Sequence, residues 1–200
     1  FNDLNLPEVI LKMPEQQLGD DETMALSQAM REFAPGRISK RFAATGRANL
    51  KHWVCPEDLT ENECLLEFTN SYELSELGKW SLVERSEVVS LPVFRLLSIQ
   101  LQQADPVYGD TSNARLNWHT QIIARERGTP LAPPVGVPLE QIIEDIQIFT
   151  HEDQNPVEIR RFSDHSNADI RQRNEEDFRT RVNFVRDGVP AALGMSMTVD

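Results

Sequence analysis

The chain has 200 residues, of which 20 are Lys or Arg and 32 are Asp or Glu, and its formal net charge is −12. This acid excess disfavours non-specific binding of nucleic acid by the surface as a whole, and no apolar run reaches the roughly 18–20 residues of a membrane-spanning helix. Two cysteines provide no disulfide framework, so we expect an intracellular location, cytoplasmic or within an assembled particle.

Residues 1–19 contain two prolines and no sustained hydrophobic period, which predicts an extended N-terminal arm. Residues 20–200 would then form the domain. The arm carries five apolar residues that indicate contact with its own domain or with a neighbouring subunit: Leu4, Leu6, Val9, Ile10 and Leu11.

A helix is predicted from Asp20 or Asp21, which would cap it, to about Phe33, because Pro35–Gly36 follows. Next comes the basic segment, residues 36–54. Placed on a helix, its basic residues share one face and its apolar residues lie opposite. The pattern predicts a partner-binding surface made of Arg37, Lys40, Arg41, Arg47 and Lys51.

Three partners suit such a basic face. We favour an acidic surface, within the chain or on another copy, since residues 53–110 hold eleven acidic and three basic residues. Nucleic acid is a less favoured alternative, because Phe42 and Trp53 fall on the opposite face and could not stack on bases. A membrane surface is not expected, because the apolar face is short and a glycine interrupts it.

Capping signals and apolar periodicity predict further helices within residues 61–72, 90–101, 112–128, 138–149 and 167–186. A short strand is expected at the C-terminal end. The predicted fold is therefore all-α or predominantly α, a multi-helix domain with an extended N-terminal arm and at most minor strand content. The Pro-rich loop 129–138 is a candidate division between two lobes.

Two groups of residues are candidates for a metal site. His52, Cys55 and Cys64 supply three ligands of the kind that zinc prefers, and the fourth would be distant. The alternative is that the two cysteines are small buried side chains. The second group could bind a divalent metal or perform acid–base chemistry, although caps and turns also explain its residues: His151, Asp153, Asp164 and His165.

The sequence contains no phosphate-binding loop, dinucleotide fingerprint, nucleophile elbow or zinc-protease helix, and we expect no cofactor. The favoured function is a non-catalytic helical interaction or assembly module, part of a larger chain or multi-subunit complex. It would contact a protein partner or other copies of itself through the basic face and the arm. The alternatives are a metal-dependent hydrolase with a site near residues 151–165 and a nucleic-acid-binding regulator that uses residues 37–51.

Overall fold

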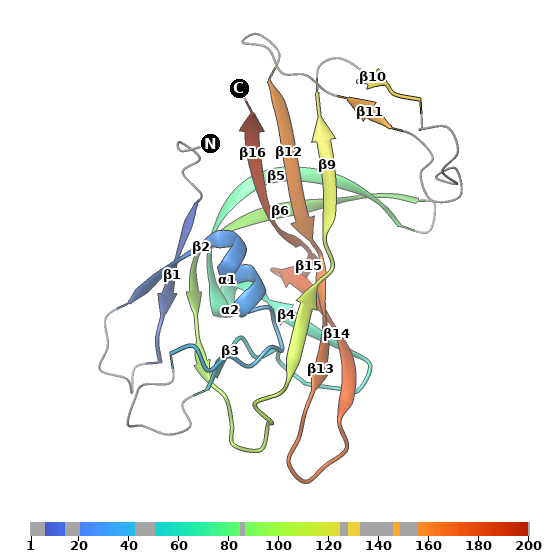
Figure 1. The fold of residues 1–200 in the computed structure, drawn as a ribbon. Helices are drawn as coiled ribbons and strands as arrows, with labels where there is room; N and C mark the ends of the chain where they lie inside the picture. Colours follow the sequence, from blue (N-terminus) through green and yellow to red (C-terminus); the bar gives the residue numbers. More distant parts are fainter. Residues whose placement is uncertain are drawn as a thin grey trace. The chain divides into compact units, whose positions relative to one another are not determined.

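The computed structural model describes residues 7–14, 21–42, 51–84, 87–124, 128–132, 146–148 and 156–199. The chain is β-rich, with curled sheets and two short helices in the described residues (Figure 1). The prediction of an all-α or predominantly α fold is therefore wrong. None of the helices in these residues has the length and apolar character needed to cross a membrane.

The first sheet has the strand order β2-β1-β6-β16-β12-β9, and β5 pairs with β6. The N-terminal strand β1 pairs antiparallel with β2 and parallel with β6. Its strands are β1 (Glu8–Lys12), β2 (Glu22–Ala25), β5 (Tyr72–Glu84), β6 (Glu87–Gln100), β9 (His119–Ile123), β12 (Val157–Ser163) and β16 (Ala192–Val199).

The second sheet has the order β15-β14-β13-β8, and β4 pairs parallel with β14. Its strands are β4 (Glu63–Glu67), β8 (Asn113–Leu116), β13 (His165–Ile170), β14 (Phe178–Arg186) and β15 (Val189–Pro190). Two small pairs complete the strands in the described part of the chain: β3 (His52–Trp53) with β7 (Gln102–Gln103), and β10 (Thr129–Pro130) with β11 (Gln147–Ile148).

The chain divides into two compact units. Unit 1 comprises Phe1–His119 and Phe162–Gly194, and unit 2 comprises Thr120–Arg161 and Met195–Asp200. The Pro-rich residues 129–138 belong to unit 2, and those from 133 onward lie outside the described residues. All the residues that form the site below belong to unit 1.

One helix prediction is confirmed in its C-terminal part, and one strand prediction is confirmed. Helix α1 (Leu26–Glu32) buries the expected face, which consists of Leu26, Ala29, Met30 and the following Phe33. The predicted start at Asp20 or Asp21 is wrong, because residues 22–25 form β2 and pair with β1. The predicted C-terminal strand is β16. The other described helix, α2 (Phe68–Ser71), is a single turn inside the range where a longer helix was expected.

The remaining helix predictions are wrong where the structure describes the chain. Residues 90–101 are mostly buried, as their composition indicates, but residues 90–100 belong to strand β6. A short apolar run suits a buried strand as well as a helix. In β14 the buried residues are Thr180, Val182 and Phe184, which is a period of two. The prediction for residues 138–149 lies almost entirely outside the described residues.

The predicted arm is in part a strand of the sheet. In β1 Val9 and Leu11 are fully buried, whereas Ile10 between them is exposed. Residues 1–6 and 15–20 lie outside the described part of the chain. The apolar residues that suggested contact with a surface thus include two that pack into the chain's own core.

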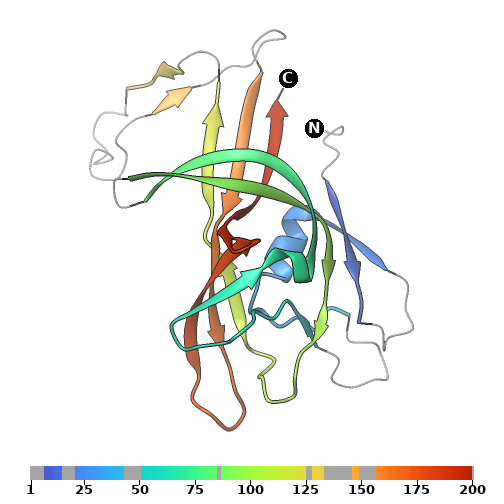
Figure 2. The ribbon, with the colours of Figure 1, turned by 180° about the vertical axis from the view of Figure 1, so that it is seen from behind.

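The longest element of unit 1 is the β5–β6 hairpin, whose strands have 13 and 14 residues. Figure 2 shows the two strands bending together along their length. The register shifts twice, and Gly78 at the second shift has a φ of 105°, a conformation that favours glycine. One face of the hairpin packs Trp80, Leu91 and other side chains against Phe162.

Candidate functional site

Strands β4, β14 and β13 present an outer face on which side chains form cross-strand rows. The pairing register places Glu63 beside Arg181 in one row. The next row consists of Leu65, Asn183 and His165. Because side chains alternate along a strand, the residues between these rows point to the core. Cys64, Leu66, Val182 and Phe184 are accordingly buried.

A pocket of about 370 Å³ lies between this outer face and the β5–β6 hairpin. We call it the hairpin groove. Its apolar lining includes Leu82, Val89 and Leu91 from the hairpin and Leu65, Val185 and Pro190 from the opposite side. Three polar residues also line the groove: Asp164, Arg181 and Asn183. Leu65 is 58% exposed, so the groove is open to solvent.

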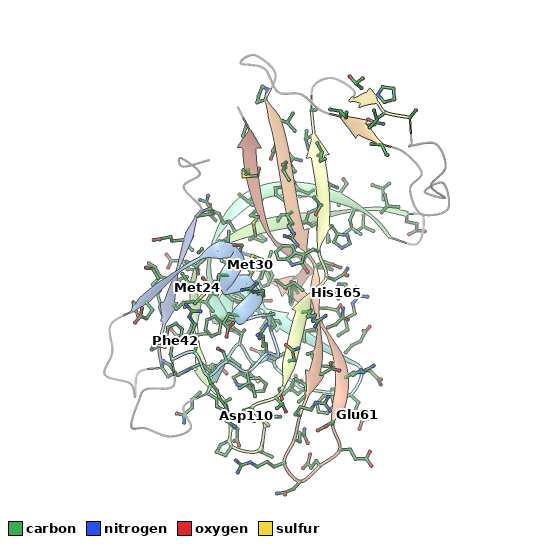
Figure 3. All side chains as sticks on the ribbon, viewed as in Figure 1. Met24, Met30, Phe42, Glu61, Asp110 and His165 are labelled. Carbon is green, nitrogen blue, oxygen red and sulfur yellow. The ribbon has the colours of Figure 1, made fainter. Side chains whose placement is uncertain are left out.

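Asp164 organises the polar end of the groove from the bend between β12 and β13. Its Oδ1 atom accepts hydrogen bonds from His165 Nδ1 at 2.9 Å and His119 Nε2 at 3.3 Å, and its Oδ2 lies 3.5 Å from a terminal nitrogen of Arg181. Figure 3 labels His165 beside this bend. Arg181 Nε also donates to Asn183 Oδ1 at 2.8 Å.

The carboxyl group of Asp164 is strongly acidic. Burial alone would raise its pKa, but hydrogen bonding and charge from His165, with a further hydrogen bond from His119, lower the pKa to about 2. The carboxylate is therefore ionised at neutral pH and holds Arg181 in a fixed position at the groove.

The two hydroxyls that flank the cluster in sequence serve the fold. Ser163 and Ser166 are fully buried and donate to backbone carbonyls, Ser163 to His165 at 2.7 Å and Ser166 to Pro35 at 2.9 Å. Within the described residues no group of three or more His, Cys, Asp or Glu side chains is arranged to hold a metal ion. An apolar pocket with a few convergent polar groups is suited to bind a ligand.

A second hollow, of about 400 Å³, opens along β13 and β14, but its lining is mostly polar. It includes Asp169 and Arg179, which pair with each other at 2.8 Å, and the Arg179 side chain is 90% exposed. Water already solvates such groups, so this hollow offers little apolar surface to a ligand. The hairpin groove is therefore the better candidate.

Where the structure describes residues 36–54, at 36–42 and 51–54, the chain forms turns and extended segments in place of the predicted basic helix, and Ser39 is bridged to His52. Two of the five predicted basic residues form ion pairs inside the chain. Arg37 donates to the carbonyl of Arg31 and lies 3.8 Å from Glu32, and Lys40 pairs with Asp110.

The other basic residues differ in burial. Lys51 is buried, and its ammonium lies 3.5 Å from the carbonyl oxygen of Tyr108. Arg41 is exposed, and Arg47 lies outside the described residues. Phe42 stacks on Phe33 with ring centroids 6.0 Å apart, so this aromatic packs on the fold rather than standing free.

The residues of the first metal candidate serve the fold. Burial lowers the pKa of His52, which is fully buried in β3. Burial, with the neighbouring Cys64, raises the pKa of Cys55 to about 11, so its thiol stays protonated. Cys64 Sγ lies 3.0 Å from Thr180 Oγ1 in the core. The three do not form a metal-binding group.

The structure describes two of the four residues of the second metal candidate. His151 and Asp153 lie outside the described residues, whereas Asp164 and His165 are hydrogen-bonded to each other. The structure thus brings together two of the four residues, adds His119 and Arg181 to them, and places them at the groove. The hydrolase and nucleic-acid alternatives stay predictions.

Sequence reasoning missed the groove residues Leu65, Arg181 and Asn183. For Arg181 and Asn183 the signal is the alternation of polar and apolar residues from Arg181 to Phe184, whereas Leu65 stands among apolar neighbours and carries no such signal. A helical interpretation of residues 167–186 concealed the alternation. No model of a known protein family, no curated sequence and no solved structure matches the chain, so its function is argued from this geometry.

Proposed function

We propose that the chain is a non-catalytic, β-rich interaction and assembly module that associates with other copies of itself. The observation that carries the proposal is the pair Val83 and Val88, which face each other across the β5–β6 hairpin and are each 73% exposed. Full burial of one such side chain is worth about 1.5–3 kcal/mol, so this pair favours association.

The hairpin is suited to present this pair. Its opposite face is anchored in the core by Trp80 and Phe162, whose rings meet edge to face at 5.5 Å. A rigid scaffold lowers the entropy lost on binding. Contact between identical hairpin faces of two copies is self-complementary and closes with two-fold symmetry.

Sedimentation equilibrium over a range of protein concentrations tests the proposal with the double variant Val83→Ser/Val88→Ser. We expect the unmodified chain to self-associate and the double variant to dissociate at least tenfold more easily. The matched control is Ile10→Ser, which removes an aliphatic side chain that is 43% exposed on β1. A chain that stays monomeric up to about 0.5 mM, a concentration that detects even weak dimers, would contradict the proposal.

We also propose an intracellular setting. Cys55 and Cys64 form no disulfide, and thiols of this kind persist in reducing compartments. Thiol titration of freshly isolated protein, with and without denaturant, checks that both remain reduced.

A further inference from the structure

We propose that the hairpin groove binds an extended segment of a partner protein in which an aliphatic or aromatic side chain is flanked by lysine or arginine. The proposal rests on the interaction function above and adds the chemistry of a partner. It concerns a different surface from the Val83–Val88 pair, since those two side chains point away from the groove-lining face of the hairpin.

The shape of the groove suits an apolar side chain on an extended backbone. Residues 181, 183 and 185 of β14 line it in succession, which spans roughly 13 Å at about 3.3 Å per residue. The hairpin supplies an apolar wall with Leu82 and Leu91, and Leu65 stands exposed opposite. An inserted aliphatic or aromatic group would therefore contact apolar surface on both sides.

The charges at the groove select for cations. Arg181 is the one basic residue among its lining residues, and Asp164 lies beside it as an ion-pair partner. On the same outer face Glu63 adjoins Arg181 and Glu67 adjoins Val185 in the register. Within the lining Asp164 and Arg181 offset each other, so Glu63 and Glu67 on the adjoining strand β4 make the rim of the groove acidic, which attracts lysine or arginine beside the inserted side chain.

Glu67 is held in its ionised form by the local backbone. Desolvation alone would raise the pKa of this carboxyl group, but hydrogen bonds from the backbone amides of Gly188 and Asp187, together with those from Thr69, lower it. The negative charge is thus fixed at the end of the groove beside the turn between β14 and β15.

The polar end of the groove can also form a hydrogen bond with a peptide backbone. Arg181 is oriented by Asp164 on one side and Asn183 on the other, and a guanidinium has five donors. A donor left over from these two contacts suits a backbone carbonyl of the partner. This combination of an apolar slot, acidic surroundings and an oriented donor favours a peptide over a purely apolar small molecule.

Fluorescence anisotropy with labelled synthetic peptides of roughly eight residues, long enough to cross the groove, tests the inference. The probes share a Gly/Ser backbone and differ at the centre: leucine between lysines, leucine between glutamates, and alanine between lysines. We expect the lysine–leucine–lysine peptide to bind at least tenfold more tightly than either of the others, and its affinity to fall with added salt.

Two variants locate the site. Leu65→Ser and Glu63→Lys should each weaken binding of the lysine–leucine–lysine peptide at least fivefold. The matched controls on β1, Ile10→Ser and Glu8→Lys, should leave it unchanged, because both residues are exposed away from the groove. Circular dichroism confirms that each variant is folded.

Equal binding of the glutamate-flanked peptide, or binding that Leu65→Ser leaves intact, would overturn the inference. So would the absence of peptide binding in protein that still self-associates, and this result leaves the proposed assembly function standing. Conversely, peptide binding that persists when Val83→Ser/Val88→Ser dissociates the copies supports the groove as a separate surface.

Discussion

Two charged regions of the chain have opposite fates in the fold. In the basic segment, Arg37 and Lys40 meet Glu32 and Asp110, and Lys51 is buried against a carbonyl oxygen. Beside the hairpin groove, by contrast, Glu63 and Glu67 of β4 add carboxylates next to the Asp164–Arg181 pair. In the described part of the basic segment two cations are thus paired with carboxylates, whereas the acidic side chains near the groove come from several strands.

The difference shows what marks a binding surface. A run of like charges in the sequence does not by itself make a charged surface. The fold can bring opposite charges from distant residues to it, as Asp110 pairs with Lys40. Charge that remains after internal pairing, next to accessible apolar side chains, is the better indicator. At the groove both conditions are met by Leu65 and its neighbours on β4.

The largest expected effect distinguishes Phe184, a core residue beneath the groove, from Leu65, an exposed residue that lines it. Phe184 is buried and its ring lies 5.4 Å from that of Phe68, so Phe184→Ala should destabilise the chain by about 3–5 kcal/mol. Leu65→Ser removes an exposed side chain and should change stability by less than about 1 kcal/mol. Urea unfolding measures both, and similar losses in the two variants would remove the distinction between core and contact surface.

The next effect concerns the carboxylate that holds Arg181. Because the pKa of Asp164 is lowered to about 2, below its value of about 3.9 in an unfolded chain, ionised Asp164 stabilises the fold. After a discount for partial exposure, Asp164→Asn should cost about 1–2 kcal/mol at pH 7.

This contribution is fully present above about pH 4 and is lost as the pH falls towards 2. The stability difference between Asp164→Asn and the unmodified chain should therefore shrink over that range in urea unfolding experiments. A stability difference that is the same at pH 7 and at pH 2.5, which lies between these two pKa values, would contradict the assigned role.

A smaller effect tests whether the basic segment serves the fold. Lys51→Met keeps the length of a buried side chain but leaves the carbonyl oxygen of Tyr108 without this donor, at a cost of about 1 kcal/mol. Self-association and peptide binding should not change. If Lys51→Met kept its stability but lost self-association or peptide binding, the basic segment would be the partner-contact surface.

The smallest effect is expected at the surface pair Lys40–Asp110. Both side chains are well exposed, so Lys40→Ala should shift the midpoint of thermal unfolding by less than about 2 °C. Differential scanning calorimetry in low and in high salt measures the shift. A larger shift that salt abolishes would show that this neutralisation matters to stability, and would sharpen the contrast with the groove.

Parts of the fold were predictable from the sequence because local signals determine them. The apolar face of α1 was found from its helical spacing, and the alternation near the C-terminus predicted β16. The burial of residues 90–101 was evident from composition alone. Their strand conformation was not, because β6 is buried on both faces at several positions and shows no alternation.

The site was less predictable, since pairing between distant strands creates it. Asp164 and His165 were selected for the chemistry of their side chains, but only the fold shows that Asp164 contacts His119 and Arg181 as well as His165. Residues 167–186 were predicted to form a helix. In the structure Arg171 pairs with Asp177 across the turn between β13 and β14.

The parallel pairing of β4 with β14 has a consequence for how the chain folds. Cys64 and Thr180, which meet in the core beneath this pair, are 116 residues apart in sequence. Such contacts form late, because a long loop must close before they contribute any free energy. During synthesis β4 would have an unpaired edge until β14 has been made. The nascent chain is therefore most exposed to wrong strand pairing during that time.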